Sequence, residues 1–272
     1  MDDLLAHVLE AHGGLEAWVG VTRLTAQVSA GGAFWKLRGW PNIYADATVE
    51  LDARREHITF RPFTAPDRIS VLDVDPERLT IQTTDGQIVE ERDNPRVSYP
   101  VNFDPERTRW DAIQVAYFMS AATWNYLTTP FVFTYPGVHA REIEPWSEHG
   151  QNWRRLAVTF PKTNANHNAD QVFYFDDDFM QRRVDYAPDV AGGKNLVAHY
   201  THDPKTFGGF VFPTRRRVHR REPDGVADQS FAFITLTSKP SMWSGRDIRH
   251  RKAGQRIPIA DPRRPTVDDQ RV

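Results

Sequence analysis

The sequence predicts an all-β protein, built mainly of antiparallel strands, with an N-terminal helix and one central helix. From residue 22 onward, short segments of alternating or β-branched and aromatic residues are separated by Gly, Pro or Asp, which is the pattern of strands and turns. No helical stretch separates the first strands, as parallel βαβ units would require, so we expect antiparallel pairing. One long apolar stretch near the middle of the chain has the period of a helix instead.

The N-terminal helix is predicted over residues 2–19. Between Leu4 and Trp18 the apolar residues recur with helical spacing, and two aspartates precede them, where a helix N-terminus favours negative charge. Gly13 and Gly14 interrupt this pattern, and glycine commonly ends a helix. We therefore expect a helix that breaks at the glycine pair and continues for one short second turn.

Strands are expected on both sides of the central helix, about 12 to 13 in number by this pattern. Asp85 and Gly86 lie in a segment that favours a tight hairpin turn. The strands expected before the central helix span residues 22–29, 33–40, 45–52, 55–60, 67–74 and 77–84. Those expected after it span residues 138–146, 152–160, 170–176, 180–187, 196–203, 210–221 and 231–238.

The central helix is predicted over residues 109–126. Thr108 and Asp111 fit a capping box before it, and Pro130 ends the segment. Apolar residues occupy nearly all sides of this helix. Such a helix is buried on most of its surface, so we expect it to lie inside the protein.

Residues 1–245 are expected to form a single domain, followed by a basic, proline-containing tail over 246–272. The tail holds eight Lys and Arg residues against four Asp, and its three prolines interrupt any regular element. We expect it to contribute little to the stability of the core.

Composition excludes several classes of function. The chain has 34 Lys and Arg residues against 36 Asp and Glu, which argues against bulk electrostatic binding of nucleic acid. It has no cysteine, so disulfides, a thiolate nucleophile and cysteine-ligated metals are excluded. No apolar run is long enough for an integral membrane segment. The first residues are acidic and lack the apolar centre of a secretory signal, so we expect a cytoplasmic location.

One succession of motifs in the second half of the chain resembles a known family. An acidic turn at 176–178 is followed by a basic–apolar–acidic strand at 182–186, and a later strand at 209–215 reads Gly, three apolar residues, Pro, any residue, Arg. This resembles the LolA-like and LppX-like lipoprotein-carrier superfamily. The resemblance implies a strongly curved, half-open antiparallel barrel around an apolar cavity, with residues 109–126 as a plug helix, in a cytoplasmic bacterial member of that group.

His199 and Tyr200 are the candidate catalytic residues, because residues 199–203 hold the densest set of proton-transfer groups in the chain. Neighbouring residues of a strand point to opposite faces, so His199 and His202 are poorly placed to share a metal ion, and we expect no metal. One face could still present an imidazole or a phenol to a cavity, where histidine serves as a general base near neutral pH.

Aromatic residues supply the candidate ligand-binding wall. Trp and Tyr offer rigid apolar surface with one polar atom each, which suits a small-molecule pocket. The predicted wall contains Trp35, Trp40, Trp124 and Tyr126, and two isolated histidines, His57 and His167, are candidate polar contacts. The same aromatic residues would also serve to fill a large core.

Two functions remain open from the sequence. The first is the binding of a small hydrophobic or aromatic molecule in the barrel cavity, without a cofactor. The second is a cofactor-independent enzyme, an isomerase, lyase, cyclase or hydrolase of small-molecule metabolism, that uses His and Tyr for proton transfer. The fold alone does not choose between them. An enzyme requires two ionisable groups within hydrogen-bond reach of each other and of the cavity.

Overall fold

The structure, a computed structural model, describes residues 2–243. Their strands before the central helix are β1 (Arg23–Gly31), β2 (Ala47–Asp52), β3 (His57–Arg61), β4 (Arg68–Val74), β5 (Glu77–Thr83) and β6 (Ile88–Asp93). The strands after it are β7 (His139–Glu148), β8 (Gln151–Thr159), β9 (Asp170–Phe175), β10 (Gln181–Tyr186), β11 (Val197–Phe207), β12 (Phe210–Arg221), β13 (Ala227–Asp228) and β14 (Ile234–Trp243).

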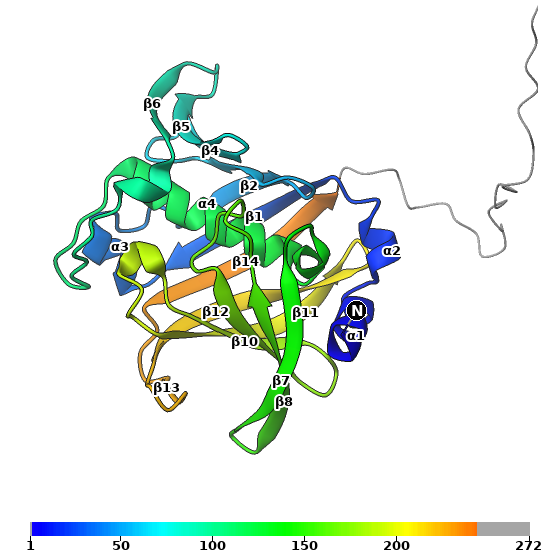
Figure 1. Cartoon of the computed structure of the whole chain (residues 1–272). Helices are drawn as coiled ribbons and strands as arrows, with labels where there is room; N and C mark the ends of the chain where they lie inside the picture. Colours follow the sequence, from blue (N-terminus) through cyan, green and yellow to red (C-terminus); the bar gives the residue numbers. More distant parts are fainter. Residues whose placement is uncertain (1, 244–272) are drawn as a thin grey trace, which may run out of the picture.

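All these strands belong to one antiparallel sheet. Its order is β6-β5-β4-β3-β2-β1-β14-β12-β11-β10-β9-β8-β7, with β13 added to β12. The path has two ends, β6 and β7, which do not pair with each other, so the sheet is open. It curves strongly around the helix labelled α4 in Figure 1. The half-open, all-β architecture expected from the sequence is confirmed.

The N-terminal segment forms two helices, α1 (Asp3–Ala11) and α2 (Leu15–Trp18), separated by the glycine pair as expected. The Asp2 carboxylate caps α1 by accepting a hydrogen bond from the Leu4 amide at 3.0 Å. Gly13 has a φ of 116°, and a Cβ there would lie 2.5 Å from the Gly209 carbonyl oxygen. Only glycine allows this close approach, which holds the end of α1 against the turn between β11 and β12.

Residues 33–40, expected as a strand, form the helix α3 (Ala33–Arg38) instead, so this prediction was wrong. The chain leaves β1 at Gly32, which has a φ of 106°, and α3 ends at Gly39 in the left-handed conformation. Between these glycines the local residues are good helix formers. Burial of Trp35 then fixes the helix against the core.

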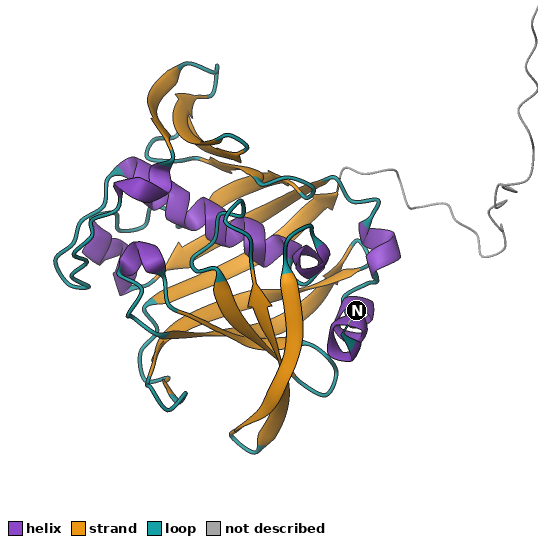
Figure 2. Ribbon diagram, viewed as in Figure 1, coloured by secondary structure: helices purple, strands orange, loops and turns teal. Residues whose placement is uncertain are grey.

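The central helix, α4 (Ala112–Thr128), lies across the concave face of the sheet (Figure 2). Fifteen of its 17 residues are buried, which confirms that it is enclosed on nearly all sides. Its capping box pairs Asp111 with Gln114, and not Thr108 with Asp111. The Thr108 hydroxyl instead accepts from the Asp104 amide in the preceding turn. The helix therefore begins and ends slightly later than residues 109–126.

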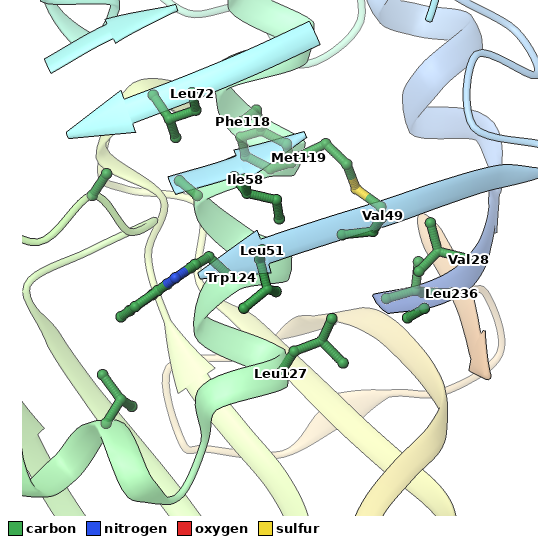
Figure 3. Close-up of a cluster of buried hydrophobic side chains, with 14 of the residues drawn as sticks. Val28, Val49, Leu51, Ile58, Leu72, Phe118, Met119, Trp124, Leu127 and Leu236 are labelled. Atoms are coloured by element: carbon green, nitrogen blue, oxygen red, sulfur yellow. The ribbon is translucent and has the colours of Figure 1, made fainter. Parts of the chain in front are cut away.

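The first half of the sheet packs on α4 through branched aliphatic side chains. In Figure 3, Trp124 and Leu127 of α4 lie beside Leu51 of β2, while Phe118 lies nearer Ile58 of β3. All five are buried. Burying one such side chain contributes about 1.5–3 kcal/mol relative to leaving it exposed, so this contact anchors α4 within the curve.

Two strands were not expected. β6 is exposed along almost its whole length and therefore lacks the alternation that identifies a strand. β13 has two residues. The remaining elements are the short 3-10 helices η1 (Pro95–Ser98), η2 (Phe131–Thr134) and η3 (Asp189–Ala191). The predicted tail at 246–272 and the domain end at 245 lie outside the described residues.

Candidate binding site

Two small cavities lie between α4 and the second half of the sheet. Each has a volume of about 20 Å³, which is room for roughly one water molecule. They share four lining residues, Ala122, Tyr126, His167 and Arg216. The first cavity has an apolar wall that includes Trp35, Phe118 and Met119. The second is lined in part by the polar side chains of Asn125, Asn166, Gln171 and Gln181.

Five polar side chains, four of them buried and Tyr126 partly buried, converge at these cavities and are called the central cluster below. They come from separate parts of the chain. The cluster consists of Tyr126 on α4, Tyr186 at the end of β10, His199 on β11, Arg216 on β12 and His167 in the connection between β8 and β9. The strand residues point inward because they lie on the same face as buried apolar neighbours. His199 pairs with Val218 across β11 and β12, and both line the first cavity.

The rings of the central cluster are in mutual contact. The Tyr186 hydroxyl lies 3.4 Å from His199 Nδ1, and the Tyr126 hydroxyl lies 3.5 Å from His167 Nε2. His167 also stacks on the Tyr186 ring with centroids 5.3 Å apart. The two tyrosine hydroxyls hydrogen bond to each other. The cluster is thus a continuous set of phenol and imidazole groups within hydrogen-bond reach of one another.

Arg216 is the charged member of the central cluster. It is 3% exposed, and its guanidinium lies over the Tyr126 ring at 4.3 Å from the centroid. Its Nη2 donates to the Tyr126 carbonyl oxygen at 3.4 Å. Among residues 2–243, no carboxylate lies within ion-pair distance of it, and the groups that act on its charge are Tyr126 and Tyr186. Burial without a counter-charge lowers the pKa of Arg216 to about 10.

Burial also keeps both histidines of the cluster neutral. It lowers the pKa of His167 to about 3, and the charge of Arg96 acts in the same direction. Burial lowers the pKa of His199 well below its ordinary value, and the charge of Arg216 acts in the same direction. His199 Nε2 is buried and lacks a hydrogen-bond partner in the described part of the chain. Burial raises the pKa of Tyr126 and Tyr186, so both phenols stay protonated.

The segment that carries His167, residues 160–169, lines part of both cavities and is called the strap below. Phe160 and Ala165 of this segment are buried in the hydrophobic core, and the His167 ring packs on Phe118 with centroids 4.1 Å apart. The segment also makes polar contacts. Asn164 Nδ2 and the Ala165 amide both donate to Glu56 Oε2 at 2.9 Å, and Arg96 Nη1 donates to the Asn166 carbonyl oxygen at 2.6 Å. Glu56 is 8% exposed, and burial raises its pKa well above the ordinary value. Hydrogen bonds to the buried carboxyl group of Glu56 therefore help to hold the strap in place.

The structure brings together four of the residues predicted from the sequence. Trp35, Tyr126, His167 and His199 all line the first cavity. Tyr126 and His199 meet edge to face with ring centroids 5.0 Å apart. These contacts come from tertiary packing, since the four residues are spread over more than half of the chain.

Tyr200 lies on the opposite face of the sheet from His199. Its hydroxyl donates to Glu148, and Arg183 Nη1 donates to that hydroxyl at 3.3 Å. Arg183 is fully buried there and bonds Asp185 through both Nε and Nη2, at 2.6 and 2.8 Å, and Glu148 through Nη1 at 2.6 Å. Tyr200 therefore belongs to a saturated ion-pair network on the convex face, away from the cavities.

Trp40, Trp124 and His57 also lie away from the central cluster. Trp40 Nε1 donates to the Trp110 carbonyl oxygen, and Trp124 Nε1 donates to the Asp52 carbonyl oxygen, both at 2.8 Å. Each indole is thereby fixed in the surrounding structure. His57 faces outward on β3, where its Nδ1 lies 3.0 Å from Asp73 Oδ1.

Sequence reasoning missed Arg216 and Tyr186. The sequence did carry a signal for Arg216. It lies an even number of positions from Phe212 and Val218 on β12 and so shares their face, while both flanking arginines lie on the other face. Such alternation predicts an inward arginine within the basic run RRRVHRR. Tyr186 carried a similar signal through its alternation with Val184.

The described residues show neither a metal cluster nor a membrane-spanning helix. Between residues 2 and 243, no group of three or more His, Asp or Glu side chains has a geometry that could hold a metal ion. In the same part of the chain, no helix is both long enough and apolar enough to cross a membrane.

Comparisons with known proteins give similarity to solved structures only. No family model and no curated protein matches the chain. A LolA superfamily protein from Nitrosomonas europaea is 10% identical, with a TM-score of 0.46, over 89% of this chain and 93% of that one. A DUF1329 family protein from Desulfovibrio piger is 10% identical, with a TM-score of 0.38, over 88% and 92%. The lipoprotein LppX from Mycobacterium tuberculosis is 12% identical, with a TM-score of 0.26, over 88% and 94%. At these identities and scores the likeness says nothing about ligand or partner.

Proposed function

We propose that this protein binds a small, largely apolar or aromatic molecule at the central cluster, under α4. The observation that carries the proposal is the meeting of an apolar wall with buried polar groups that lack full partners. Trp35, Phe118 and Met119 form the wall. Among residues 2–243, Arg216 has no carboxylate partner and His199 Nε2 has no hydrogen-bond partner. Buried polar groups are normally hydrogen bonded, and a few convergent polar groups in an apolar pocket are typical of ligand sites.

Binding requires that the site opens. A cavity of about 20 Å³ accommodates a water molecule but not an organic ligand. Two parts of its wall can move. Met119 is an unbranched side chain that adapts to irregular shapes. The strap at 160–169 has no regular secondary structure, and water can replace its hydrogen bonds to Glu56 and from Arg96, although Phe160 and Ala165 are buried in the core. We therefore assign entry to displacement of the strap, with α4 remaining in place.

A cofactor-independent enzyme is the second candidate, favoured by one observation. Tyr186 with His199, and Tyr126 with His167, form two phenol–imidazole pairs beside the cavities. Their protonation states favour binding over general-base catalysis. A histidine with a pKa of about 3, such as His167, is a weak base at neutral pH. Neutral imidazole and phenol groups are suited to hydrogen bonding a ligand.

The proposal is tested by titration with N-phenyl-1-naphthylamine, a neutral apolar fluorophore. We expect saturable binding with energy transfer from tryptophan, because Trp35 lies in the cavity wall. Ala122→Leu should weaken binding by about tenfold or more, since the added side chain fills the wall shared by both cavities. Tyr200→Phe, on the convex face, is the control and should bind as the wild type does. Equal binding by the wild type and Ala122→Leu would place the probe elsewhere.

A second experiment separates binding from catalysis. A molecule that copurifies with the protein is released, identified by mass spectrometry and incubated with fresh protein. A binding protein leaves its mass unchanged. Conversion that disappears in His199→Gln, while binding is retained, would favour the enzyme. The cytoplasmic location stays a prediction, which cell fractionation would check.

A further inference from the structure

The buried guanidinium groups of this chain are partnered in different ways. Arg183, on the convex face, bonds two carboxylates, Asp185 and Glu148. Arg38 is enclosed by the rings of Phe34, Phe103 and Trp110 and donates to a backbone carbonyl, while its Nε and Nη1 have no hydrogen-bond partner in the described part of the chain. Arg216, by contrast, has one ring and one long hydrogen bond, and the two cavities lie directly beside it.

This arrangement is costly for the free protein. A guanidinium carries five N–H donors and stays charged at physiological pH. A buried charge without a partner is strongly destabilising, and Arg216 is 3% exposed without an ion-pair partner among the described residues. An apolar residue of similar size at this position of β12 would avoid the free-energy cost of burying an unpaired charge. Arg38 also lacks a carboxylate partner, but three aromatic rings enclose it, whereas Arg216 lines two cavities. The cavities beside the unpaired Arg216 therefore point to a partner that the protein binds.

A second polar atom faces the same cavity. His199 Nε2 is buried and has no hydrogen-bond partner in residues 2–243. When the Tyr186 hydroxyl donates to Nδ1 at 3.4 Å, the proton of the neutral ring is on Nε2. His199 then offers an N–H donor on the cavity wall that also contains Arg216. A charged donor and a neutral donor on one wall suit a group with two oxygens.

We propose that the ligand carries an anionic oxygen head group of the carboxylate class, which pairs with Arg216 while its apolar body lies against Trp35 and Phe118. This inference rests on the proposed function and names the chemistry of its ligand. Pairing with a carboxylate would complete the partners of Arg216, as Asp185 and Glu148 complete those of Arg183. The apolar wall selects an amphipathic anion over a small inorganic one.

The test compares two probes that share one skeleton. N-phenyl-1-naphthylamine is neutral, and 8-anilino-1-naphthalenesulfonate adds an anionic oxygen group to it. We expect the wild type to bind the sulfonate about tenfold or more tightly, because charge-assisted pairing with a buried arginine is strong. Decanoate should displace the bound sulfonate at concentrations about tenfold lower than decanol does.

Substitutions assign the preference to one residue. Arg216→Met should remove the difference between the two probes while the neutral probe still binds. Arg215→Met is the matched control, because Arg215 is the adjacent residue of β12 but is exposed and paired with Asp203 at 3.1 Å. It should keep the full preference. Arg216→Lys should retain part of it, since a single charge remains without the planar fork of donors.

The outcomes separate this inference from the proposed function. Saturable binding of the neutral probe with no preference for the sulfonate, unchanged in Arg216→Met, overturns the anionic head group and leaves the binding function standing. If Arg215→Met also loses the preference for the sulfonate probe, the preference comes from surface charge, and the inference is overturned. If neither probe binds saturably, the proposed function fails and the inference falls with it.

Discussion

The guanidinium of Arg216 lies over the ring of Tyr126, 4.3 Å from its centroid, and donates to the carbonyl oxygen of the same residue. This contact joins β12 to α4 at the centre of the curved sheet. A cation–π contact of a desolvated arginine contributes about 2 kcal/mol, which offsets only part of the cost of burying the charge. Arg216 is thus held in place but not neutralised.

The first prediction concerns the stability cost of this arginine. Arg216→Met should raise the free energy of unfolding by about 1 kcal/mol, or the Tm by about 2–4 °C, because a buried unpaired charge is replaced by an apolar side chain of similar length. Arg183→Met is the matched comparison and should lower the free energy of unfolding by about 3 kcal/mol or more, since it leaves Asp185 and Glu148 without their buried partner. Calorimetry of both variants measures the two effects. If Arg216→Met and Arg183→Met lower the free energy of unfolding equally, Arg216 stabilises the fold and the prediction is wrong.

A second prediction follows from the neutral histidines. Burial lowers the pKa of His167 to about 3, so between that value and the ordinary 6.5 the unfolded chain binds more protons than the folded chain. Stability therefore falls as the pH drops below 6.5. Urea titrations between about pH 7 and pH 5 should show a loss of up to about 1.4 kcal/mol per pH unit for each such histidine. His167→Gln should reduce this slope. An equal slope in the wild type and in His167→Gln would contradict the burial of His167.

Glu56 predicts a pH dependence of the opposite sign. Its pKa is raised above the ordinary 4.5, so the folded chain holds the proton more tightly than the unfolded chain. This contribution to stability is complete below about pH 4.5 and is lost as the pH rises through the folded pKa. In Glu56→Gln, a neutral side chain at every pH, this part of the pH dependence should disappear. A control at the exposed Glu10→Gln should retain it, as fluorescence-monitored denaturation at several pH values would show.

The strap provides a fourth prediction. Glu56→Ala removes the acceptor of the hydrogen bonds from Asn164 and the Ala165 amide. We expect faster hydrogen exchange in residues 160–169 and a free energy of unfolding lower by about 1–3 kcal/mol. If the strap opens for entry, as proposed above, association of N-phenyl-1-naphthylamine should be faster in this variant. Faster exchange with unchanged association would place the entry route elsewhere.

The enclosure of α4 gives the last prediction. Ala121 is 1% exposed, so Ala121→Asp buries a carboxylate without a partner and should unfold or aggregate the protein. Ala6→Asp introduces the same change at an exposed position of α1. It should leave circular dichroism and the Tm nearly unchanged. A soluble Ala121→Asp variant of wild-type stability would mean that α4 is exposed.

The sequence by itself determined the elements whose pattern is local. The period of α4 and its apolar surface on all sides identified a buried helix, and Asp85 and Gly86 identified the hairpin between β5 and β6. Alternation also predicted that His199 and Tyr200 point to opposite faces. These features depend on backbone periodicity and turn geometry, which neighbouring residues fix on their own.

Tertiary structure alone decided which face is the interior. His199 and Tyr200 are both buried, one under α4 and one under the convex ion-pair network, so burial patterns along β11 do not distinguish them. The helix at Ala33–Arg38 is fixed against the core by Trp35, which packs against Phe118 from a distant segment. The isolation of Arg216 from any described carboxylate is likewise a property of its spatial neighbours. Charge pairing and burial depend on contacts between residues far apart in the chain, and no local pattern encodes them.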